Sequence, residues 1–424
     1  MRIFMGFTEI AGFYKHLKLG FQQKGFKCTF VDLNGSRFQY NGDDTPNLLI
    51  KWLKWLYKRN SKSFTDKILK QLWWPSKALV FLWALFNYDV FIFGYNSSFL
   101  RFYDFPILKF FGKKIICQFH GSDSRPPYID GAIMASGLVN IEQCIKMTYQ
   151  KKQIIKKIDK YADIIINTPT QGHFHERPFV LWPFVGLPYE DIAKGHSPSG
   201  KYDNNNDIRI VHAPSALEAK GTKEINIIVD KLKNKGYKIT FLEIIGRPNS
   251  EVLDELAECD FVVDQLYCDC HMPGLATEAA CFGKPTVVGS YAIDVWQNLI
   301  PQNKIPPTYF CHPDEFEEAV EKLINDEQYR SELGNRANKF VQTEWSVAKV
   351  IESYLRLIKG DIPEHWMYDP QDIRYVHGLG LSEKYLKTII RNVIEQGGIE
   401  ALQLSDKPEL EQLFKAFAYS GGVE

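Results

Sequence analysis

The chain of 424 residues has no excess of charge, because 51 lysine and arginine residues are balanced by 51 aspartate and glutamate residues. This balance argues against a general nucleic-acid binder, which needs a basic surface to hold phosphates. The first residues, MRIFMGFTEIAGF, contain no charged segment followed by an apolar one, so they do not resemble a secretion signal. We therefore expect a cytoplasmic protein that has no nucleic-acid partner.

Long apolar runs are also missing. The best candidate for a membrane span, residues 78–100, is interrupted by Asp89. Each uncharged piece of this run has about half of the roughly 20 residues that a span requires. The run is therefore predicted to be a helix followed by a buried strand.

Neither a disulfide framework nor a metal centre is indicated by the eight cysteines. Several lie inside apolar runs, as buried reduced thiols do, and a chain of this length does not need disulfides to be stable. Cys268, Cys270 and His271 look like half of a zinc site, but no second pair at ligand spacing completes the usual four ligands. The loop FTEIAG has too few glycines for a dinucleotide fingerprint, so Asp32 is not predicted to bind the ribose of NAD. We expect no metal and no cofactor.

What the sequence does contain is a regular alternation of short apolar runs and amphipathic segments. Thr222 is predicted to cap one of the helices, which ends at Gly236. Strand–helix–strand units of this kind form right-handed parallel sheets, so we expect an α/β protein with two Rossmann-like domains that face each other across a cleft. Strands are expected at residues 2–7, 27–33, 89–94, 114–121, 162–168, 207–214, 237–246, 260–267 and 284–289.

A polar stretch with proline and glycine separates the two units. The predicted organisation is an N-terminal Rossmann-like domain (1–185), a linker (186–206), a C-terminal Rossmann-like domain (207–344), a closing helix (345–360) and an acidic helical tail (361–424). The tail is expected to be a small helical appendage.

Ligands of open α/β sheets bind beyond the carboxyl ends of the strands, and three polar clusters follow predicted strands. In the first, HAPSALEAKGT at residues 212–222, Lys220 and Gly221 stand just before a helix. A lysine beside free backbone N–H groups at the start of a helix suits a phosphate. The alternative is that Lys220 is an ordinary solvated lysine.

The second cluster, CDCHMPGLATEAACFGKPTVV at residues 268–288, has the pattern of a loop, a short helix at 275–282 and a buried strand. Glu278 lies one turn inside this helix, where its carboxylate could accept hydrogen bonds from both hydroxyls of a ribose while the helix start faces a diphosphate. Alternatively, Glu278 only offsets the helix dipole. In the third cluster, FHGSDSR at 119–125, His120 would project into the cleft from the opposite side, or it is a structural histidine.

In their order along the chain, FHGSD, HAPSALEAKGT and GLATEAACFGKPTVV resemble the retaining nucleotide-sugar glycosyltransferases of the two-Rossmann-domain fold, GT-B, of the family 4 type. The resemblance covers roughly residues 1–359 and is strongest in the second half. It implies that Lys220 contacts the donor diphosphate, that Glu278 binds the donor ribose and that His120 lies beside the transferred sugar. We accordingly expect catalytic roles for His120 and Lys220, donor contacts at Ser215, Lys220, Gly221, Gly246, Arg247, Cys270, Pro273, Gly274, Leu275, Ala276, Thr277 and Glu278, and acceptor-side positions at Gly12, Gly121 and Asp123.

Two departures from the family pattern concern the donor site. The place of an arginine that many members carry shortly before the lysine is taken here by residues 214–216, PSA, and the place of a sugar-contacting glutamate is taken by Cys270, with Asp269 as a candidate substitute. The resemblance implies transfer of a sugar from a nucleotide-diphosphate donor to a glycan or lipid-linked acceptor, with retention and without a metal, in bacterial-type surface polysaccharide or glycoconjugate assembly. Two alternatives stay open: a non-catalytic sugar-nucleotide-binding partner of another transferase, and a GT-B-fold nucleotide-sugar epimerase, which would need acid–base carboxylates on both sides of the sugar.

A basic and aromatic segment lies between residues 46 and 115, where twelve lysines and arginines stand against three acids. In LLIKWLKWLYKRN, Leu49, Trp52, Leu53 and Leu56 fall on one helical face with lysines interspersed. Such a stripe at residues 49–59 can lie on an anionic membrane surface, which would make the protein peripheral on the inner face of the membrane. It can also be a core-facing stripe with a solvated rim.

The tail has the opposite charge, with eleven acids against six lysines and arginines in residues 361–424 and helical patterns at 383–396 and 409–417. We hypothesise that it packs on the basic domain.

Overall fold

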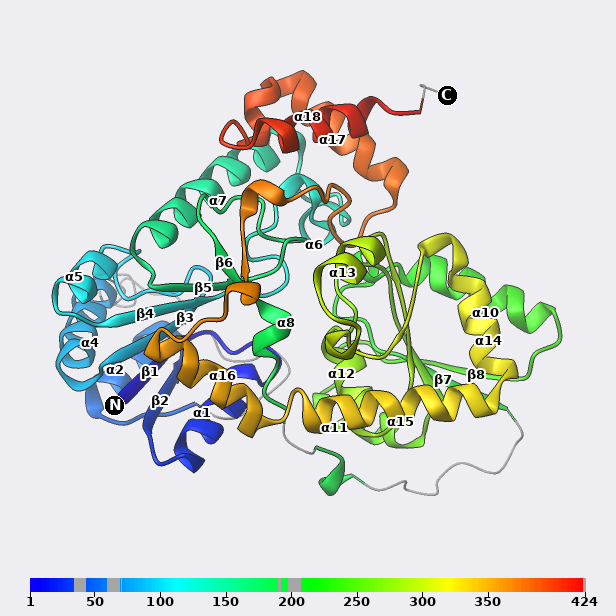
Figure 1. The fold of residues 1–424 in the computed structure, drawn as a ribbon, viewed down its shortest axis with the longest axis horizontal. Helices are drawn as coiled ribbons and strands as arrows, with labels where there is room; N and C mark the ends of the chain where they lie inside the picture. The colour runs from blue at the N-terminus through cyan, green and yellow to red at the C-terminus, as the bar shows by residue number, and fades with distance from the viewer. Residues whose placement is uncertain (34–42, 59–68, 70, 190–191, 197–206, 422–424) are drawn as a thin grey trace.

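The computed structural model describes residues 1–33, 43–58, 69, 71–189, 192–196 and 207–421. It has two α/β domains, each built on one sheet, with α8 and α16 where the domains meet (Figure 1). The C-terminal helices lie above the first domain in this view. Within the predicted linker, residues 190–191 and 197–206 lie outside the described residues, as does Arg59 of the predicted basic stripe.

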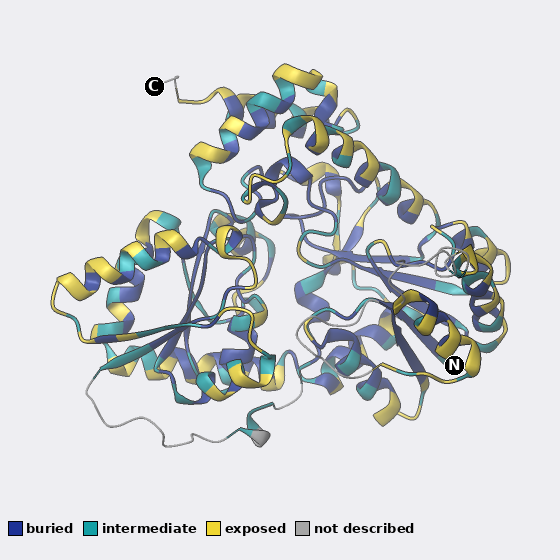
Figure 2. Ribbon diagram, turned by 180° about the vertical axis from the view of Figure 1, so that it is seen from behind, coloured by how far each residue is buried: buried dark blue, intermediate teal, exposed yellow. Residues whose placement is uncertain are grey.

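The first domain is built on a seven-stranded sheet with the order β12-β6-β5-β4-β3-β1-β2. All neighbouring strands are parallel except β12, which runs antiparallel to β6. The buried residues of both sheets run along the strands, as Figure 2 shows in dark blue, because helices cover both faces. The strands are β1 (Arg2–Phe7), β2 (Lys27–Asp32), β3 (Val90–Gly94), β4 (Lys114–Gln118), β5 (Ile164–Asn167), β6 (Phe179–Leu181) and β12 (Met367–Tyr368).

The helices of the first domain follow the expected strand–helix rhythm. The predicted apolar run at 78–100 is the end of α4 followed by β3, and none of the described helices is long and apolar enough to cross a membrane. The helices are α1 (Phe13–Gln23), α2 (Leu48–Lys58), α4 (Trp73–Asn87), α5 (Asp104–Phe110), η1 (Pro127–Ile129), α6 (Gly131–Met134), α7 (Ile141–Tyr161) and α8 (Trp182–Val185), and η2 (Ile192–Gly195) follows them.

The second domain has a five-stranded parallel sheet with the order β11-β10-β9-β7-β8. Its strands are β7 (Ile208–His212), β8 (Ile239–Glu243), β9 (Phe261–Cys268), β10 (Thr286–Ser290) and β11 (Tyr309–Cys311). Its helices are α9 (Leu217–Lys220), α10 (Thr222–Asn234), α11 (Asn249–Glu258), α12 (Gly274–Cys281), α13 (Ile293–Leu299), η3 (Gln302–Lys304), η4 (Pro313–Glu315), α14 (Phe316–Asn325) and α15 (Glu327–Thr343). Two facing parallel-sheet domains are thus present, and the expected fold class is confirmed.

After α15 the chain returns to the first domain. Helix α16 (Val347–Lys359) packs against α1, and at Gly20 an added Cβ would lie 2.4 Å from Val347, so the two helices are in close contact. The tail then forms η5 (Glu364–Trp366), β12, η6 (Pro370–Asp372), α17 (Glu383–Gly397), η7 (Ile399–Leu402) and α18 (Pro408–Tyr419). Its helix α17 packs on α7 and η1 of the first domain, which lie outside the basic segment 46–115.

One local prediction was wrong. Gly221, in a left-handed conformation, is the N-cap of α10, and Thr222 is its first helical residue; the Thr222 hydroxyl bonds His212 Nε2 at 2.9 Å and does not cap the helix.

The apolar stripe of α2 is divided between the two environments that the sequence left open. Leu53 and Leu56 are buried together with Ile50, whereas Leu49 and Trp52 are 38% and 40% exposed.

Candidate functional site

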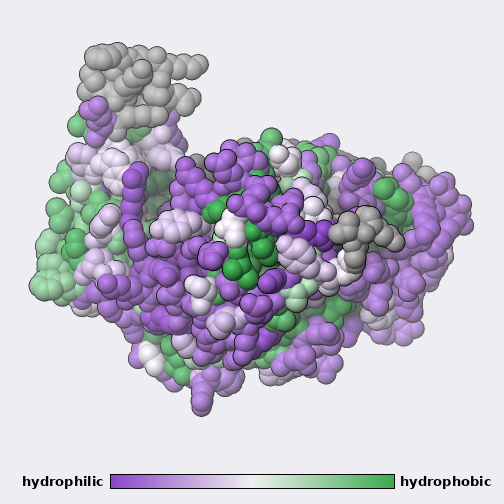
Figure 3. All heavy atoms as spheres, turned by 90° about the horizontal axis from the view of Figure 1, so that it is seen from above, coloured by the Kyte–Doolittle hydropathy of each residue, from purple (hydrophilic) through white to green (hydrophobic). Residues whose placement is uncertain are grey.

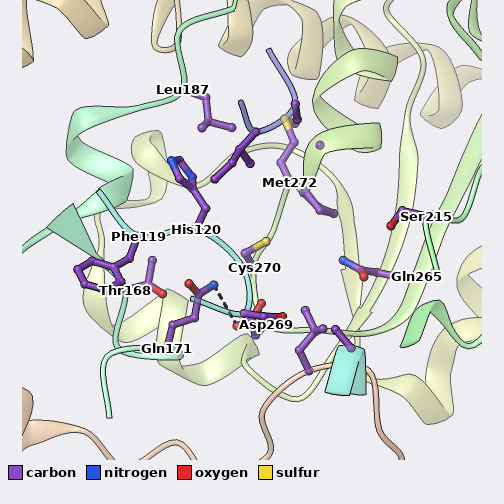
Figure 4. A pocket seen from close by; sticks show the side chains of 18 of the residues that line it. Phe119, His120, Thr168, Gln171, Leu187, Ser215, Gln265, Asp269, Cys270 and Met272 are labelled. Atoms are coloured by element: carbon purple, nitrogen blue, oxygen red, sulfur yellow. Dashed lines mark hydrogen bonds between the residues drawn. The ribbon is translucent and has the colours of Figure 1, made fainter. Parts of the chain in front are cut away.

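A cavity of about 330 Å³ lies between the two domains, where the carboxyl ends of their strands meet (Figure 4). Residues after β4 and β5 line it from the first domain, and residues after β7 and β9 line it from the second, as expected for ligands of open parallel sheets. Of the predicted site residues, His120, Gly121, Ser215, Lys220, Cys270, Pro273 and Gly274 line this cavity.

Lys220 is held by a carboxylate that the sequence did not single out. Its Nζ donates to Asp264 Oδ1 at 2.9 Å, and the Asp264 side chain, on β9, is 1% exposed. Burial alone would lower the pKa of Lys220, but the Asp264 carboxylate outweighs it and the pKa is raised. Asp264 also accepts a hydrogen bond from the backbone N–H of Ala276 in α12 at 3.3 Å. One buried carboxylate therefore fixes both the amine and the first turn of the helix, and Lys220 keeps its positive charge.

The helix α12 begins at the cavity. Pro273 and Gly274, at its start, line the cavity, whereas the predicted donor residues Leu275, Ala276 and Thr277 are not among the described residues that line it. The first N–H groups of a helix have no partner inside the helix and carry the positive end of its dipole. An anion in the cavity would therefore meet the amine of Lys220 and the start of α12 together.

His120 faces this cationic end from the first domain. Its ring packs edge-on against Phe13 with centroids 4.5 Å apart, and its buried Nε2 has no hydrogen-bond partner among the described residues. Burial lowers the pKa of His120 to about 3, so the imidazole is neutral near pH 7. A neutral ring with an unused nitrogen can exchange a hydrogen bond with a hydroxyl of a bound ligand.

Of the predicted acceptor-side residues, Gly121 lines the cavity, whereas Asp123 stabilises the turn beside it. Gly121, at φ 49°, lines the cavity, but Gly12 and Asp123 are not among the described residues that do so. The Asp123 carboxylate accepts the backbone N–H of His120 at 2.8 Å, and burial raises its pKa to about 7. Gly12 is the N-cap of α1, at φ 78°. Asp123 thus shapes the turn that carries His120.

Glu9 caps the start of α1. It belongs to the segment FTEIAG, which the sequence predicts only as a loop. Its carboxylate accepts the backbone N–H groups of Ile10, Tyr14 and Lys15 at 2.8, 3.1 and 3.0 Å. Burial raises the pKa of Glu9 to about 7. The start of α1, where Ile10, Ala11 and Phe13 also line the cavity, therefore already has a carboxyl cap of its own.

Glu278 lies away from the cavity, on the far side of α12. Its Oε1 accepts a hydrogen bond from Asn249 Nδ2 at 2.9 Å, and the residue is 7% exposed. Gly246, at φ 67°, and Arg247, which pairs with Glu251 at 3.3 Å, belong to the neighbouring loop after β8. Sequence reasoning missed Asn249, whose signal is an amide at the first position of α11.

The loop after β9 carries the thiols and an inter-domain contact. The Sγ atoms of Cys268 and Cys270 are 3.7 Å apart, and the hydrogen bond with Cys268 together with burial raises the pKa of Cys270. Asp269 stands between these two cysteines in the sequence, and its carboxylate ion-pairs with Arg125 of the first domain. Gln171, also of the first domain, donates to Asp269 Oδ2 at 3.2 Å, as Figure 4 shows.

Ligand atoms of Cys268, Asp269 and Cys270 lie within 4.8 Å of one another and form the one metal-like group in the described part of the chain. The aspartate is already engaged by Arg125 and Gln171. His271 does not join the group, because its ring stacks on Phe310 with centroids 3.7 Å apart. The arrangement therefore offers two thiols rather than a complete ligand set.

Arg125 is fully buried and reaches across the domain boundary. Besides Asp269 it lies 3.5 Å from Asp130, and the two carboxylates keep the pKa of Arg125 above its usual value despite burial. Lys151 Nζ donates to the carbonyl oxygens of Ser122 and Arg125 at 2.7 and 2.9 Å. Sequence reasoning missed the Arg125–Asp269 pair, since its members are separated by 144 residues.

No model of a known protein family matches the chain. No curated protein is similar to it in sequence. Among solved structures it is similar to HepE of Anabaena in complex with UDP-glucose (13% identity, 84% of this chain and 99% of that chain, TM-score 0.46) and to the lipopolysaccharide outer core galactosyltransferase WaaB (11%, 85% and 100%, 0.45). It is also similar to SnogD, a glycosyltransferase from Streptomyces nogalater (11%, 84% and 98%, 0.39). At TM-scores below 0.5, these likenesses carry no further conclusion for this chain.

Proposed function

We propose that the protein is a glycosyltransferase that moves a sugar from a nucleotide-diphosphate donor to a glycan or lipid-linked acceptor. The observation that carries the proposal is the convergence of the Lys220 amine and the start of α12 on one side of the inter-domain cavity, with the neutral His120 on the other. A cationic pocket opposite an uncharged hydrogen-bonding group suits a diphosphate joined to a sugar.

The chemistry of such a site is electrostatic. As the glycosidic bond breaks, negative charge gathers on the leaving diphosphate, and Lys220 with the first N–H groups of α12 would stabilise it. Asp264 supports this role because it holds the amine charged and in place before the donor arrives. Retention of anomeric configuration and independence from a metal are part of the proposal, and the resemblance of the three motifs supports them.

The nucleoside would extend from the diphosphate along α12 toward Glu278. The Glu278 carboxylate is oriented by Asn249, and the loop with Gly246 and Arg247 is adjacent in the chain to Asn249. A carboxylate fixed in this way can accept hydrogen bonds from both ribose hydroxyls once the amide of Asn249 shifts or shares its acceptor. We place the nucleoside at this edge and the sugar near His120.

The test is a comparison of two neighbouring lysines. Lys220→Ala should lower transfer from a panel of nucleotide sugars by about 10²–10³ because one preorganised charge donor is lost. Lys223→Ala is the matched control: Lys223 is exposed, lies three residues away and belongs to the first turn of α10, whereas Lys220 ends α9. Near-normal turnover of Lys220→Ala, with both variants folded by circular dichroism, would sink the assignment.

A non-catalytic nucleotide-sugar binder is the second candidate. It is favoured by Cys270, which stands where the family resemblance places a sugar-contacting glutamate, and by Asp269, whose carboxylate is held by Arg125 and Gln171. The two candidates separate in one experiment. Thermal-shift screening identifies the stabilising nucleotide sugar, and a hydrolysis and transfer assay with that sugar then distinguishes an enzyme from a binder.

The acceptor side supports a peripheral membrane location. Exposed apolar side chains gather on α2, α4 and α5, and Figure 3 shows hydrophobic atoms at the left-hand end of the molecule, which in Figure 1 carries α4 and α5. Phe86 of α4 is 66% exposed and Phe110 of α5 is 85% exposed. The exposed apolar residues of these elements include Leu49, Trp52, Trp55, Trp74, Leu79, Leu82, Phe86, Ile107, Phe110 and Phe111.

Basic side chains border this apolar face. Arg101 lies over the ring of Trp74 at 4.5 Å, and Lys51 and Lys58 are exposed on α2. Apolar side chains that insert between headgroups, with cations beside them, are the combination that binds anionic lipid. We infer that α2, α4 and α5 rest on the membrane that holds a lipid-linked acceptor.

Co-sedimentation with liposomes tests this location. Wild-type protein should bind vesicles rich in phosphatidylglycerol more than neutral vesicles. The double variant Phe86→Ser/Phe110→Ser should lose most of this binding, whereas Leu138→Ser, which changes an equally exposed residue (85%) elsewhere in the domain, should keep it. Equal binding by all three proteins, or none by the wild type, would contradict the inference.

A further inference from the structure

The tail between η6 and α17 runs through the interior instead of over the surface. Tyr375, Val376 and Leu381 are 4%, 8% and 2% exposed; between them residues 378 and 380 are buried and residues 377 and 379 are half-buried. In Figure 1 this orange segment lies beside α6 and α13, which belong to different domains. A mere appendage would leave such a connection solvated, so the burial calls for a specific set of partners.

On one side the segment bonds to the first domain as a short parallel bridge. The backbone N–H of Leu379 donates to the carbonyl of Ile129 at 3.1 Å, and the N–H of Gly131 donates to the carbonyl of Leu379 at 2.7 Å. Asp130 and Leu379 are the paired residues of this bridge. His173 Nε2 contacts the Tyr375 carbonyl oxygen at 2.7 Å. The segment is thus fixed to the loop that follows the His120 turn.

On the other side the same segment bonds to the second domain. The N–H of Gly380 donates to the carbonyl of Tyr267 at 2.7 Å, and the N–H of Glu383 donates to the hydroxyl of Tyr291 at 3.2 Å. The rings of His377 and Tyr291 stack with centroids 4.7 Å apart. Residues 377–383, which we call the strap, therefore connect the two domains through backbone groups as well as side chains.

The strap touches the second domain at the donor site itself. Its Gly380 packs on Ala219, which directly precedes Lys220, and its bond to Tyr267 lies at the end of β9, the strand that carries Asp264. Leu379 lines the cavity beside Lys220. The strap thus contacts the residue before Lys220 and the end of the strand that carries Asp264.

We propose that the strap is a positioning element of the donor site: it holds the Lys220 turn and the end of β9 in register with the His120 side of the cavity. Gly380 and Leu379 are then positioning residues contributed by the C-terminal tail. The role of the held lysine rests on the proposed function, whereas the connection between the domains does not.

Close backbone packing explains why glycines occupy this junction. A Cβ added to Gly380 would lie 2.8 Å from the carbonyl oxygen of Ala219, and one added to Gly131 would lie 2.4 Å from the carbonyl oxygen of Gly380. At Gly378 the added atom would lie 1.9 Å from the Ile129 carbonyl oxygen. Contacts this close against backbone force the chain apart, so an alanine at any of these positions would separate the strap from a domain.

The decisive variant is Gly380→Ala, with Gly360→Ala as its matched control. Both glycines have a left-handed φ, +72° and +79°, so the backbone penalty of alanine is the same. Of these two glycines, only Gly380 packs against the second domain, at Ala219, because an added Cβ at Gly360 meets nothing within 4 Å. Differences between the two variants therefore report the strap contact and not the strain of the conformation.

The primary readout is hydrogen exchange of the full-length protein, which needs no ligand. In Gly380→Ala, peptides covering residues 217–222 and 264–270 should exchange about tenfold faster than in the wild type, whereas Gly360→Ala should match the wild type there. Unchanged exchange in a folded Gly380→Ala overturns the proposal. Should Gly380→Ala fail to fold, Tyr291→Phe decides: it removes only the hydroxyl that accepts the Glu383 N–H, and faster exchange of residues 377–383 is expected, with wild-type exchange as the contrary result.

The second readout is UDP affinity by titration calorimetry, or KM and kcat where a donor sugar is known. Gly380→Ala should weaken UDP binding about tenfold or raise KM by that factor, at a melting temperature equal to that of Gly360→Ala. If Gly380→Ala exchanges faster but Lys220→Ala leaves UDP affinity unchanged, the role of the strap is upheld and the proposed glycosyltransferase function is refuted. If Gly380→Ala exchanges like the wild type but Lys220→Ala strongly weakens UDP binding, the role of the strap is refuted and the proposed function is upheld.

Discussion

The pair formed by Lys220 and Asp264 makes the most quantitative prediction. Asp264 is 1% exposed and Lys220 is 18% exposed, so the pair is nearly withdrawn from water. Removing one member of a buried pair costs about 3–5 kcal/mol because the other charge is left without a partner. The exposed part of Lys220 lets water reach its amine, so we expect about 2–4 kcal/mol for Asp264→Asn and about 3–5 kcal/mol for Lys220→Met, which isolates the more deeply buried carboxylate.

The double variant Asp264→Asn/Lys220→Met should cost less than the sum of the two single variants. Neither charge remains to be left unpaired, and the amide oxygen that Asp264→Asn introduces can still accept the Ala276 N–H that Asp264 accepts at 3.3 Å. The coupling free energy should therefore be about 1–3 kcal/mol, measured as the non-additivity of urea-unfolding free energies. Single effects that add to within about 0.5 kcal/mol would refute the reasoning, since independent sites behave in that way.

The pH dependence of the pair follows from its raised lysine pKa. Because Asp264 raises the folded pKa of Lys220, the pair's contribution is fully present below the unfolded value of about 10.4 and is lost as the pH rises through the folded pKa. In Asp264→Asn the opposing effect of burial acts alone and lowers that pKa. In the variant the folded state therefore releases this proton at a lower pH than the unfolded chain does, so its stability should rise with pH in this region instead of falling as in the wild type. The same alkaline pH profile in both proteins would count against the assignment.

Three further predictions concern residues around the cavity. Under the proposed function, Glu278→Gln should weaken binding of a nucleoside diphosphate, with UDP as the probe, about tenfold but leave binding of inorganic diphosphate unchanged, which titration calorimetry can measure; Asn249→Ala should have the same direction with a smaller effect. Burial raises the pKa of Glu9 from 4.5 to about 7, so the folded protein holds a proton that the unfolded chain releases, and stability should fall between these pH values by about 3 kcal/mol; Glu9→Gln should remove this part of the pH profile of urea unfolding. Arg125→Met leaves the Asp269 carboxylate buried without its ion pair and should cost about 3–5 kcal/mol, with equal stability of variant and wild type as the contrary result.

The sequence was sufficient to predict most of the parallel strands, but not the short strands β6, β11 and β12. Buried parallel strands are short, mostly apolar runs, and FVVDQLY and KIICQFHG are of this kind, so their ends and the polar residues after them could be located. His120 and Lys220 come directly after such runs or just before the next helix. Strand ends in a parallel sheet are local features, and local features are what an apolar pattern contains.

Partners that are distant in the chain could not be predicted in the same way. Asp264 lies inside an apolar strand, where its pattern indicates only a buried acid, and its partner Lys220 is 44 residues away. The Arg125–Asp269 contact and the strap depend on how two domains and the tail meet, which no periodicity encodes. The glycines of HGLGLS are as compatible with a turn as with a buried strap. They are needed because backbone atoms of Ile129 and Ala219 lie close to them, and these neighbours are distant in the sequence.

Polar groups line the cavity from both domains, with Ser122, Thr168 and Gln171 on the first-domain side and Lys220 on the second-domain side. Lys220, the start of α12 and Ser215 lie toward the second domain, whereas Ile10, Phe13 and Leu187 line the side next to His120. The Cys270 thiol also lines the cavity. Because the pKa of this thiol is raised, it is neutral and only a weak hydrogen-bond acceptor. The Asp269 carboxylate accepts from both Arg125 and Gln171 through Oδ2, so a sugar hydroxyl would have to approach it at Oδ1. Under the proposed function, the diphosphate would be bound electrostatically by Lys220 and the start of α12. The sugar would be recognised by the apolar wall, by the unused His120 nitrogen and by first-domain groups such as Ser122, with the strap and the Arg125–Asp269 pair holding the two domains together.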